Sequence, residues 1–162
     1  MLGTIGSVLG LGSGPVGRIF LDELDLRVGR SGPVLVSGYD LGRWLAQRNV
    51  RVTVVEQAPR RRKKGPPQVA ADLTALPFAD ASLDAVCLAG LPSSESVVLR
   101  ECVRAVRDGG MVALAANGSA LLRRVAPPDT LAALMLHATL VDIEQRFVGG
   151  AWLTMGSVRR WV

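Results

Sequence analysis

The sequence predicts an α/β fold with a doubly wound, mostly parallel sheet and an antiparallel hairpin at its carboxyl end. Short apolar strands alternate with helical stretches over residues 33–116, which is the pattern of a parallel sheet with crossover helices. Two late apolar segments then flank Gly149-Gly150, which is a hairpin signal. The chain has 162 residues, 49% of them hydrophobic, and is long enough for one core of this kind. We therefore expect residues 15–162 to form a single domain.

The amino-terminal segment is expected to stand apart from that domain. Residues 1–14 carry too many glycines to hold a helix alone, because each glycine costs about 1 kcal/mol relative to alanine. We expect a flexible, glycine-rich arm there. The first helix is expected to begin at Pro15, since Ile19, Phe20 and Leu24 then recur near one face.

The middle of the chain supplies the parallel strands, each a short apolar run. Strands are expected at 33–37, 51–56, 68–72, 83–89 and 111–116, the last after a turn at Asp108-Gly109-Gly110. Helices are expected at 41–48, 94–106 and 130–140. The final hairpin is expected from strands at 141–148 and 152–161, with Gly149 and Gly150 in the turn positions that need positive φ.

The charge of the chain is unevenly distributed. Nineteen basic and fourteen acidic residues give a net charge of +5, which favours acidic partners. Five consecutive cations equal that whole excess: Arg60, Arg61, Arg62, Lys63 and Lys64. A solvated loop is the plainer interpretation of this run. Contact with phosphates or other anions is the alternative.

Several classes of protein are excluded by composition. No apolar run approaches the roughly 20 residues of a membrane-spanning helix, so no membrane span is expected. Cys87 and Cys102 lie in a predicted strand and helix, which indicates core thiols in a reducing cytoplasm. His137 is the single histidine, so we expect a buried or half-buried helix residue and no metal site.

A glycine turn follows the first strand, where ligands bind in an open α/β sheet. Gly38 and Gly42 flank this turn and allow a ligand to approach the backbone, while the next helix offers free N–H groups. Tyr39 stands beside the expected pocket, where its ring could stack on a ligand or fill the space of one.

Acidic residues follow the next two strands. Glu56 is placed to accept hydrogen bonds from a ribose diol. Asp72 is placed to accept one from an exocyclic amine, and Leu73 to back an aromatic ring. Two acids at consecutive strand ends beside a glycine turn indicate a cofactor that contains a nucleoside.

Residues 30–162 resemble the class I S-adenosylmethionine-dependent methyltransferases, particularly the small-molecule branch. The resemblance is carried by VLVSGYDLGRWLA, RVTVVEQAP, AADLTALPFADASLDAV and LRECVRAVRDGGMVALA, with the terminal hairpin. It implies the Rossmann-like methyltransferase fold and S-adenosylmethionine as cofactor. It also implies that Gly38 and Gly42 hold the methionine part, that Glu56 binds the ribose, and that Asp72 with Leu73 binds the adenine.

The sequence departs from the family pattern in its glycine loop. Val36 stands where the family has an acid, and Asp40 where it has the middle glycine. A carboxylate at Asp40 would face the carboxylate of the cofactor, and its side chain would crowd the close approach that glycine permits. Two further features are absent from the sequence: a substrate-binding insertion and an identifiable catalytic residue.

Three hypotheses for function follow. The first is a methyltransferase acting on a small molecule, with a protein partner completing its pocket. The second is a non-catalytic module of the same fold that serves assembly, with the arm at 1–14 as an interface to a partner or a second copy. The third and weakest is binding of nucleic acid through the basic run Arg60–Lys64.

Overall fold

A computed structural model describes residues 14–56, 64–89, 95–117 and 128–160. Two of the features discussed above lie outside the described residues. These are the arm at 1–13 and the cations Arg60, Arg61, Arg62 and Lys63.

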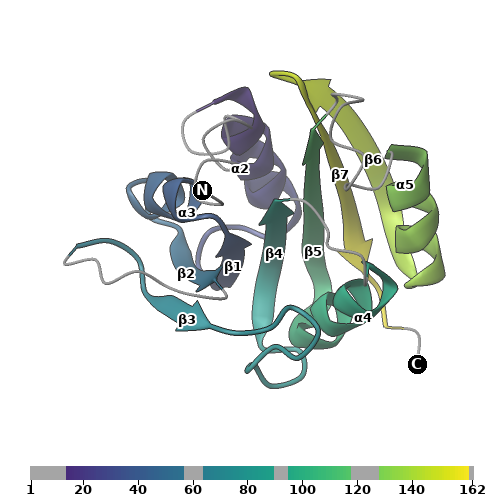
Figure 1. The fold of residues 1–162 in the computed structure, drawn as a ribbon, viewed down its shortest axis with the longest axis horizontal. Coiled ribbons are helices and arrows are strands. Elements are labelled where there is room, and N and C mark those ends of the chain that lie inside the picture. Colours follow the sequence, from purple (N-terminus) through teal and green to yellow (C-terminus); the bar gives the residue numbers. More distant parts are fainter. Residues whose placement is uncertain (1–13, 57–63, 90–94, 118–127, 161–162) are drawn as a thin grey trace.

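A sheet of seven strands forms the centre of the molecule, in the order β3-β2-β1-β4-β5-β7-β6 (Figure 1). The strands are β1 (Pro33–Ser37), β2 (Arg51–Glu56), β3 (Gln68–Ala70), β4 (Leu83–Ala89), β5 (Val106–Asn117), β6 (Leu140–Val148) and β7 (Ala151–Val158). Strands β1 to β5 are parallel, whereas β7 is antiparallel to both β5 and β6. The predicted doubly wound sheet with its terminal hairpin is confirmed.

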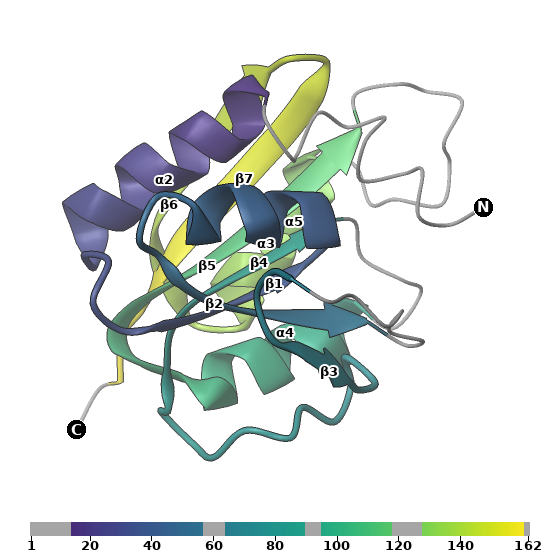
Figure 2. The same ribbon diagram turned by 90° about the vertical axis from the view of Figure 1, so that its left-hand side faces the viewer.

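Four helices of the described residues cover the two faces of the sheet. They are α2 (Pro15–Arg27), α3 (Tyr39–Ala46), α4 (Glu95–Ala105) and α5 (Pro128–His137). Figure 2 shows α2 and α3 on one side of the sheet and α4 on the other. One core joins Phe20 and Leu45 to side chains of β1 and β2, and a second joins Leu99 and Met135 to the opposite face. No helix among the described residues is both long and apolar enough to cross a membrane.

The start of β5 corrects the sequence prediction. Val106 to Gly110 belong to the strand rather than to a separate turn, because residues 107–110 bulge opposite the single residue Asp84. Gly109 adopts φ +78°. A Cβ at Gly110 would overlap the Val106 side chain and approach the Asp84 carbonyl oxygen at 2.6 Å, so the bulge needs glycine there.

Three smaller differences concern the ends of elements. Helix α3 begins at Tyr39, two residues earlier than expected, and β3 ends at Ala70, before Asp72. Helix α5 ends at His137, because Thr139 has φ +67° and cannot continue the helix. His137 is exposed rather than buried, since α5 packs on the sheet through Leu131 and Met135 and turns His137 away.

The terminal hairpin is joined to α2 by four charged residues and a serine that we call the hairpin cluster: Glu23, Arg27, Glu144, Arg146 and Ser157. Arg27 Nε donates to Glu23 Oε2 at 2.9 Å, and its Nη1 donates to Ser157 Oγ at 3.0 Å. Arg146 Nη2 donates to the other oxygen of Glu23 at 2.8 Å. The cluster therefore ties the first helix to β6 and β7 through a carboxylate that is nearly buried.

The turn of the hairpin and the outer strand have marked local geometry. Gly149 and Gly150 adopt φ +59° and +78°, as the turn was expected to require. In β6, Asp142 has φ +51° and lies where the register with β7 shifts between Val141 and Glu144. Strand β6 is thus bulged along the open edge of the sheet.

Candidate functional site

The carboxyl ends of three neighbouring strands bring the predicted site residues to one edge of the sheet. Ser37 pairs with Val55 between β1 and β2, which places Gly38 beside Glu56. Glu56 pairs with Ala70, and its carbonyl oxygen accepts a hydrogen bond from the Ala71 N–H at 3.2 Å. The glycine turn, the first acid and the segment that carries Asp72 therefore lie side by side.

Gly38 forms the turn between β1 and α3. Its φ of +109° is one that side chains rarely adopt, and a Cβ built there would meet no atom of the described residues within 4 Å. Gly38 also caps the amino end of α3, where no side chain accepts hydrogen bonds from the first turn. Open space beside a positively polarised helix end is suited to an anionic or polar group of a ligand.

Gly42 lies where α3 packs closely on the sheet. A Cβ at this position would overlap the Val54 side chain and come within 3.2 Å of Val36 Cγ2. Gly42 is buried in α3 against β1 and β2, so it permits the close packing of helix on sheet.

Tyr39 is the first residue of α3, and its side chain is directed to the connection between β2 and β3. It is 8% exposed, and its hydroxyl donates to the carbonyl oxygen of Lys64 at 2.6 Å. A Cβ at Gly65 would overlap the Tyr39 hydroxyl, so Gly65 is needed for this contact. Tyr39 thus anchors the end of the basic run.

Lys64 is the one member of the basic run within the described residues. Its side chain is exposed at the rim of an open groove of about 500 Å³, lined by Arg43, Ala46, Gln47, Lys64, Gly65 and Pro66. The groove lies beside the carboxyl half of α3, away from Gly38 at the amino end of that helix.

Asp72 stabilises its own loop and still has a free oxygen position. Its Oδ1 accepts hydrogen bonds from the Thr74 N–H at 2.8 Å and from the Thr74 hydroxyl at 2.7 Å. These bonds favour the charged form and hold the pKa of the Asp72 carboxyl below its usual value. Both bonds use Oδ1 and Asp72 is exposed, so Oδ2 is open to a further donor as far as the described residues are concerned. Leu73 is half-buried and packs against the core on the α4 face.

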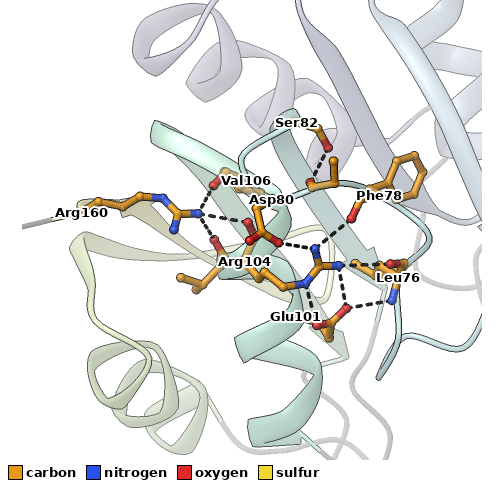
Figure 3. Close-up of polar contacts among 10 residues, drawn as sticks. Leu76, Phe78, Asp80, Ser82, Glu101, Arg104, Val106 and Arg160 are labelled. Carbon is orange, nitrogen blue, oxygen red and sulfur yellow. Dashed lines mark hydrogen bonds and ion pairs between the residues drawn. The ribbon is translucent and has the colours of Figure 1, made fainter.

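A charged group that sequence reasoning missed holds the loop that carries Asp72. We call it the loop cluster: Glu101 and Arg104 of α4 with Leu76, Phe78 and Asp80 of the β3–β4 loop (residues 71–82) (Figure 3). The spacing Glu101-x-x-Arg104 predicts an ion pair along a helix, but it does not predict that both side chains reach the loop.

The described residues supply few groups for chemistry. They contain no set of three His, Cys, Asp or Glu residues arranged to hold a metal ion. Cys87 and Cys102 are buried core thiols, as expected, and burial raises the pKa of each to about 12. Neither thiol is a nucleophile at neutral pH.

Comparison with known proteins places this arrangement in context. Residues 39–114 match a protein family described as Methyltransferase domain. No curated protein sequence matches the chain.

Several solved structures share the fold. A chain of the complex that contains the Haloferax volcanii Trm112 methyltransferase activator has a TM-score of 0.68 and 15% identity, with 94% of this chain and 98% of that chain covered. The Burkholderia thailandensis 1,6-didemethyltoxoflavin-N1-methyltransferase, solved with its substrate and S-adenosylhomocysteine, gives 0.66 and 19%, covering 91% and 80%. A Thermotoga maritima S-adenosylmethionine-dependent methyltransferase gives 0.66 and 15%, covering 95% and 92%. At these identities the likeness is one of fold.

Proposed function

We propose, from the match of residues 39–114 to the family described as Methyltransferase domain, that the chain is a class I S-adenosylmethionine-dependent methyltransferase that binds S-adenosylmethionine and methylates a small molecule. The observation that carries the proposal is the edge formed by Gly38, Glu56 and Asp72. Three consecutive strand ends there offer an open glycine turn and two acids, in the order that a nucleoside cofactor with an amino-acid tail requires.

The residues present fit the cofactor at each of its parts. The open space beside Gly38 and the amino end of α3, which has no side-chain cap among the described residues, suit the methionine portion, whose carboxylate is favoured near a helix amino terminus. Glu56 is half-buried at the end of β2 and suits the ribose hydroxyls. Oδ2 of Asp72 suits the exocyclic amine of adenine, with Leu73 beneath the ring.

The chain's own contribution to methyl transfer is orientation and exclusion of water. S-adenosylmethionine supplies an activated methyl group on a sulfonium. Gly38, Glu56 and Asp72 hold three separate points of the ligand and so fix its direction, and fixed orientation alone is worth several kcal/mol in such reactions. A general base among the described residues is not required for this role.

We also propose that a protein partner completes the pocket on the acceptor side. The Haloferax volcanii neighbour matches this chain over nearly its whole length and comes from the structure of a complex with a methyltransferase activator. A methyltransferase fold of this small size therefore has a precedent for working with a second chain.

The first test is calorimetric titration with S-adenosylmethionine and S-adenosylhomocysteine. We expect micromolar binding, and we expect Glu56→Ala and Asp72→Ala to weaken it by about tenfold each, because each leaves a donor of the ligand unpaired. The control is Asp25→Ala in α2. This change removes an exposed ion pair between Asp25 and Arg30 and should leave affinity for the ligand unchanged. Unchanged affinity in both site variants would contradict the placement of the ligand.

The non-catalytic module is the second candidate, and the observation that favours it is Asp40. This carboxylate is exposed in the first turn of α3, close to where the cofactor carboxylate would lie. If neither the wild type nor Asp40→Gly binds S-adenosylhomocysteine at millimolar concentration, the site does not bind the cofactor. The non-catalytic module is then the better description of the protein. Binding by the wild type removes this candidate as a description of the cofactor site.

A further inference from the structure

We propose that Glu101 and Arg104 of α4 are positioning residues that hold the adenine side of the cofactor site. The inference rests on the proposed function, because it assigns a task to residues that do not touch the ligand. Their target is the β3–β4 loop, which carries Asp72 and Leu73 and contains neither helix nor strand.

The backbone of the loop finds its hydrogen-bond partners on α4. The Leu76 N–H donates to Glu101 Oε2 at 2.8 Å. Arg104 Nη1 donates to the Phe78 carbonyl oxygen at 2.8 Å, and Nη2 donates to that of Leu76 at 3.1 Å. A loop without regular structure must satisfy these groups elsewhere, so α4 takes the place of a neighbouring strand or helix.

The two side chains hold each other in the geometry that the loop needs. Arg104 donates from Nε to Glu101 Oε1 at 2.8 Å and from Nη2 to Glu101 Oε2 at 3.0 Å, a two-point pair that fixes both planes. The hydrogen bond from Arg104 is the main reason that the pKa of Glu101 lies below its usual value, and the Leu76 N–H adds to it. Glu101 therefore remains a charged acceptor for the loop at neutral pH.

The end of α4 is itself held in place. Arg160, which follows β7, donates from Nη2 to the carbonyl oxygens of Val103, Arg104 and Val106 at 2.9 to 3.0 Å (Figure 3). These bonds satisfy acceptors at the carboxyl end of the helix, where Arg104 lies. The carboxyl end of α4 is thus a supported platform for the loop.

A short chain of contacts connects Leu76 to Asp72. Leu76 is 6% exposed and packs in the same core as Leu73. The Ala75 N–H donates to the Asp72 carbonyl oxygen at 3.1 Å, and Thr74 donates twice to the Asp72 carboxylate. Residues 72–75 therefore move as one turn, and releasing Leu76 from Glu101 displaces the carboxylate that would meet the adenine.

The test compares Glu101→Ala with the conservative Glu101→Gln. The glutamine keeps an oxygen that can accept from the Leu76 N–H, whereas the alanine removes it. We expect Glu101→Ala to weaken S-adenosylhomocysteine binding by about tenfold and Glu101→Gln to keep most of the affinity. The loss should be equal for 5′-methylthioadenosine, because this ligand has the adenine but lacks the amino-acid portion that Gly38 would face.

Hydrogen exchange supplies a second readout that needs no ligand. In Glu101→Ala the amides of residues 73–78 should lose protection, while those of β1 and β4 should not. Asp25→Ala again serves as the matched control, since it removes a helix carboxylate bonded to Arg30 and touches no part of the loop.

The outcomes separate the two claims. If the wild type binds S-adenosylhomocysteine and Glu101→Ala binds it equally well, the positioning role is wrong, whether or not the loop loses protection. A greater loss for S-adenosylhomocysteine than for 5′-methylthioadenosine would also overturn it, since the defect would then lie at the glycine turn. A wild type that fails to bind either ligand instead overturns the proposed function.

Discussion

The hairpin cluster and the loop cluster use the same chemistry for different ends. Both join glutamate to arginine on a helix, Glu23 with Arg27 and Glu101 with Arg104. In the hairpin cluster the helix residues bond mainly to side chains of β6 and β7, so the bonds connect a helix to regular strands. In the loop cluster they are mainly backbone groups, so the bonds give an irregular segment its shape.

Burial separates the two clusters as clearly as their partners do. The side chains of Glu23 and Arg27 are 5% and 11% exposed, whereas those of Glu101 and Arg104 are 20% and 32% exposed. Removing one member of a nearly buried ion pair leaves the other charge poorly compensated. In a partly exposed ion pair, water can solvate the charge that remains. The hairpin cluster should therefore govern stability, and the loop cluster should govern the site.

The largest expected effect is that of Glu23→Ala. It leaves Arg27 and Arg146 with the half-exposed Glu144 as their remaining carboxylate partner in the cluster, and we expect the free energy of unfolding to fall by about 2 kcal/mol. Urea denaturation measures this change, with Asp25→Ala as the control, expected to stay within about 0.5 kcal/mol. Affinity for S-adenosylhomocysteine should not change. A tenfold loss of affinity would contradict the claim that the hairpin cluster governs stability alone.

Arg104→Met tests the other side of the comparison. Methionine keeps much of the apolar stem but none of the donors to Leu76, Phe78 and Asp80. We expect a smaller loss of stability than for Glu23→Ala, together with a loss of S-adenosylhomocysteine affinity of about tenfold. Denaturation and calorimetry on the same samples provide both values. A variant that is less stable than Glu23→Ala and binds normally would reverse the assignment.

Asp40→Gly should move stability and affinity in opposite directions. An acid in the first turn of α3 is favoured by the helix dipole, and glycine is a poor helix residue, so we expect a loss of about 1 kcal/mol in stability. Removal of a carboxylate near that of the cofactor should raise affinity by about fivefold. Parallel denaturation and titration measure the two effects. Lower affinity would mean that Asp40 contributes to the site.

The two cysteines report on the two cores. Cys87 lies in the core beneath α2 and α3, and Cys102 in the core beneath α4 and α5. Burial raises the pKa of each from 9.0 to about 12, so above pH 9 the unfolded chain loses thiol protons that the folded chain keeps. Stability should therefore fall as pH rises from 9 towards 12, by about 1 kcal/mol per thiol at pH 10.

Denaturation of Cys102→Ala between pH 8 and pH 10 checks that prediction. The variant should lose less stability over this range than the wild type, because one ionising thiol is gone. Slopes that coincide would show that the thiols do not set the alkaline limit.

Elements with strong local patterns were predicted well from the sequence. The ranges 33–37, 51–56 and 83–89 match β1, β2 and β4, because buried parallel strands consist of short runs of apolar residues. The paired glycines at 149 and 150 located the hairpin for a similar reason, since few other residues accept their φ values. The positions of Gly38 and Glu56 at strand ends followed from the first two of these strands.

Features that depend on distant partners were not predicted. The sequence places Gly42 in a glycine loop, but it does not show that Val54 packs against Gly42. The segment at 108–110 reads as a turn, and only its pairing with β4 makes it a bulged strand. Arg27 and Ser157, or Glu101 and Leu76, are far apart in the chain, so no local periodicity brings them together.

The bulge in β6 has a consequence for how molecules of this protein meet one another. A straight strand at the border of a sheet offers a ladder of unpaired N–H and carbonyl groups on which a second chain can build. Here β6 is bent at Asp142 and carries exposed Asp142, Glu144 and Arg146 along its length, while the opposite border is the three-residue β3. Neither border gives a neighbouring molecule a long, flat template, which should protect concentrated samples from strand-by-strand aggregation.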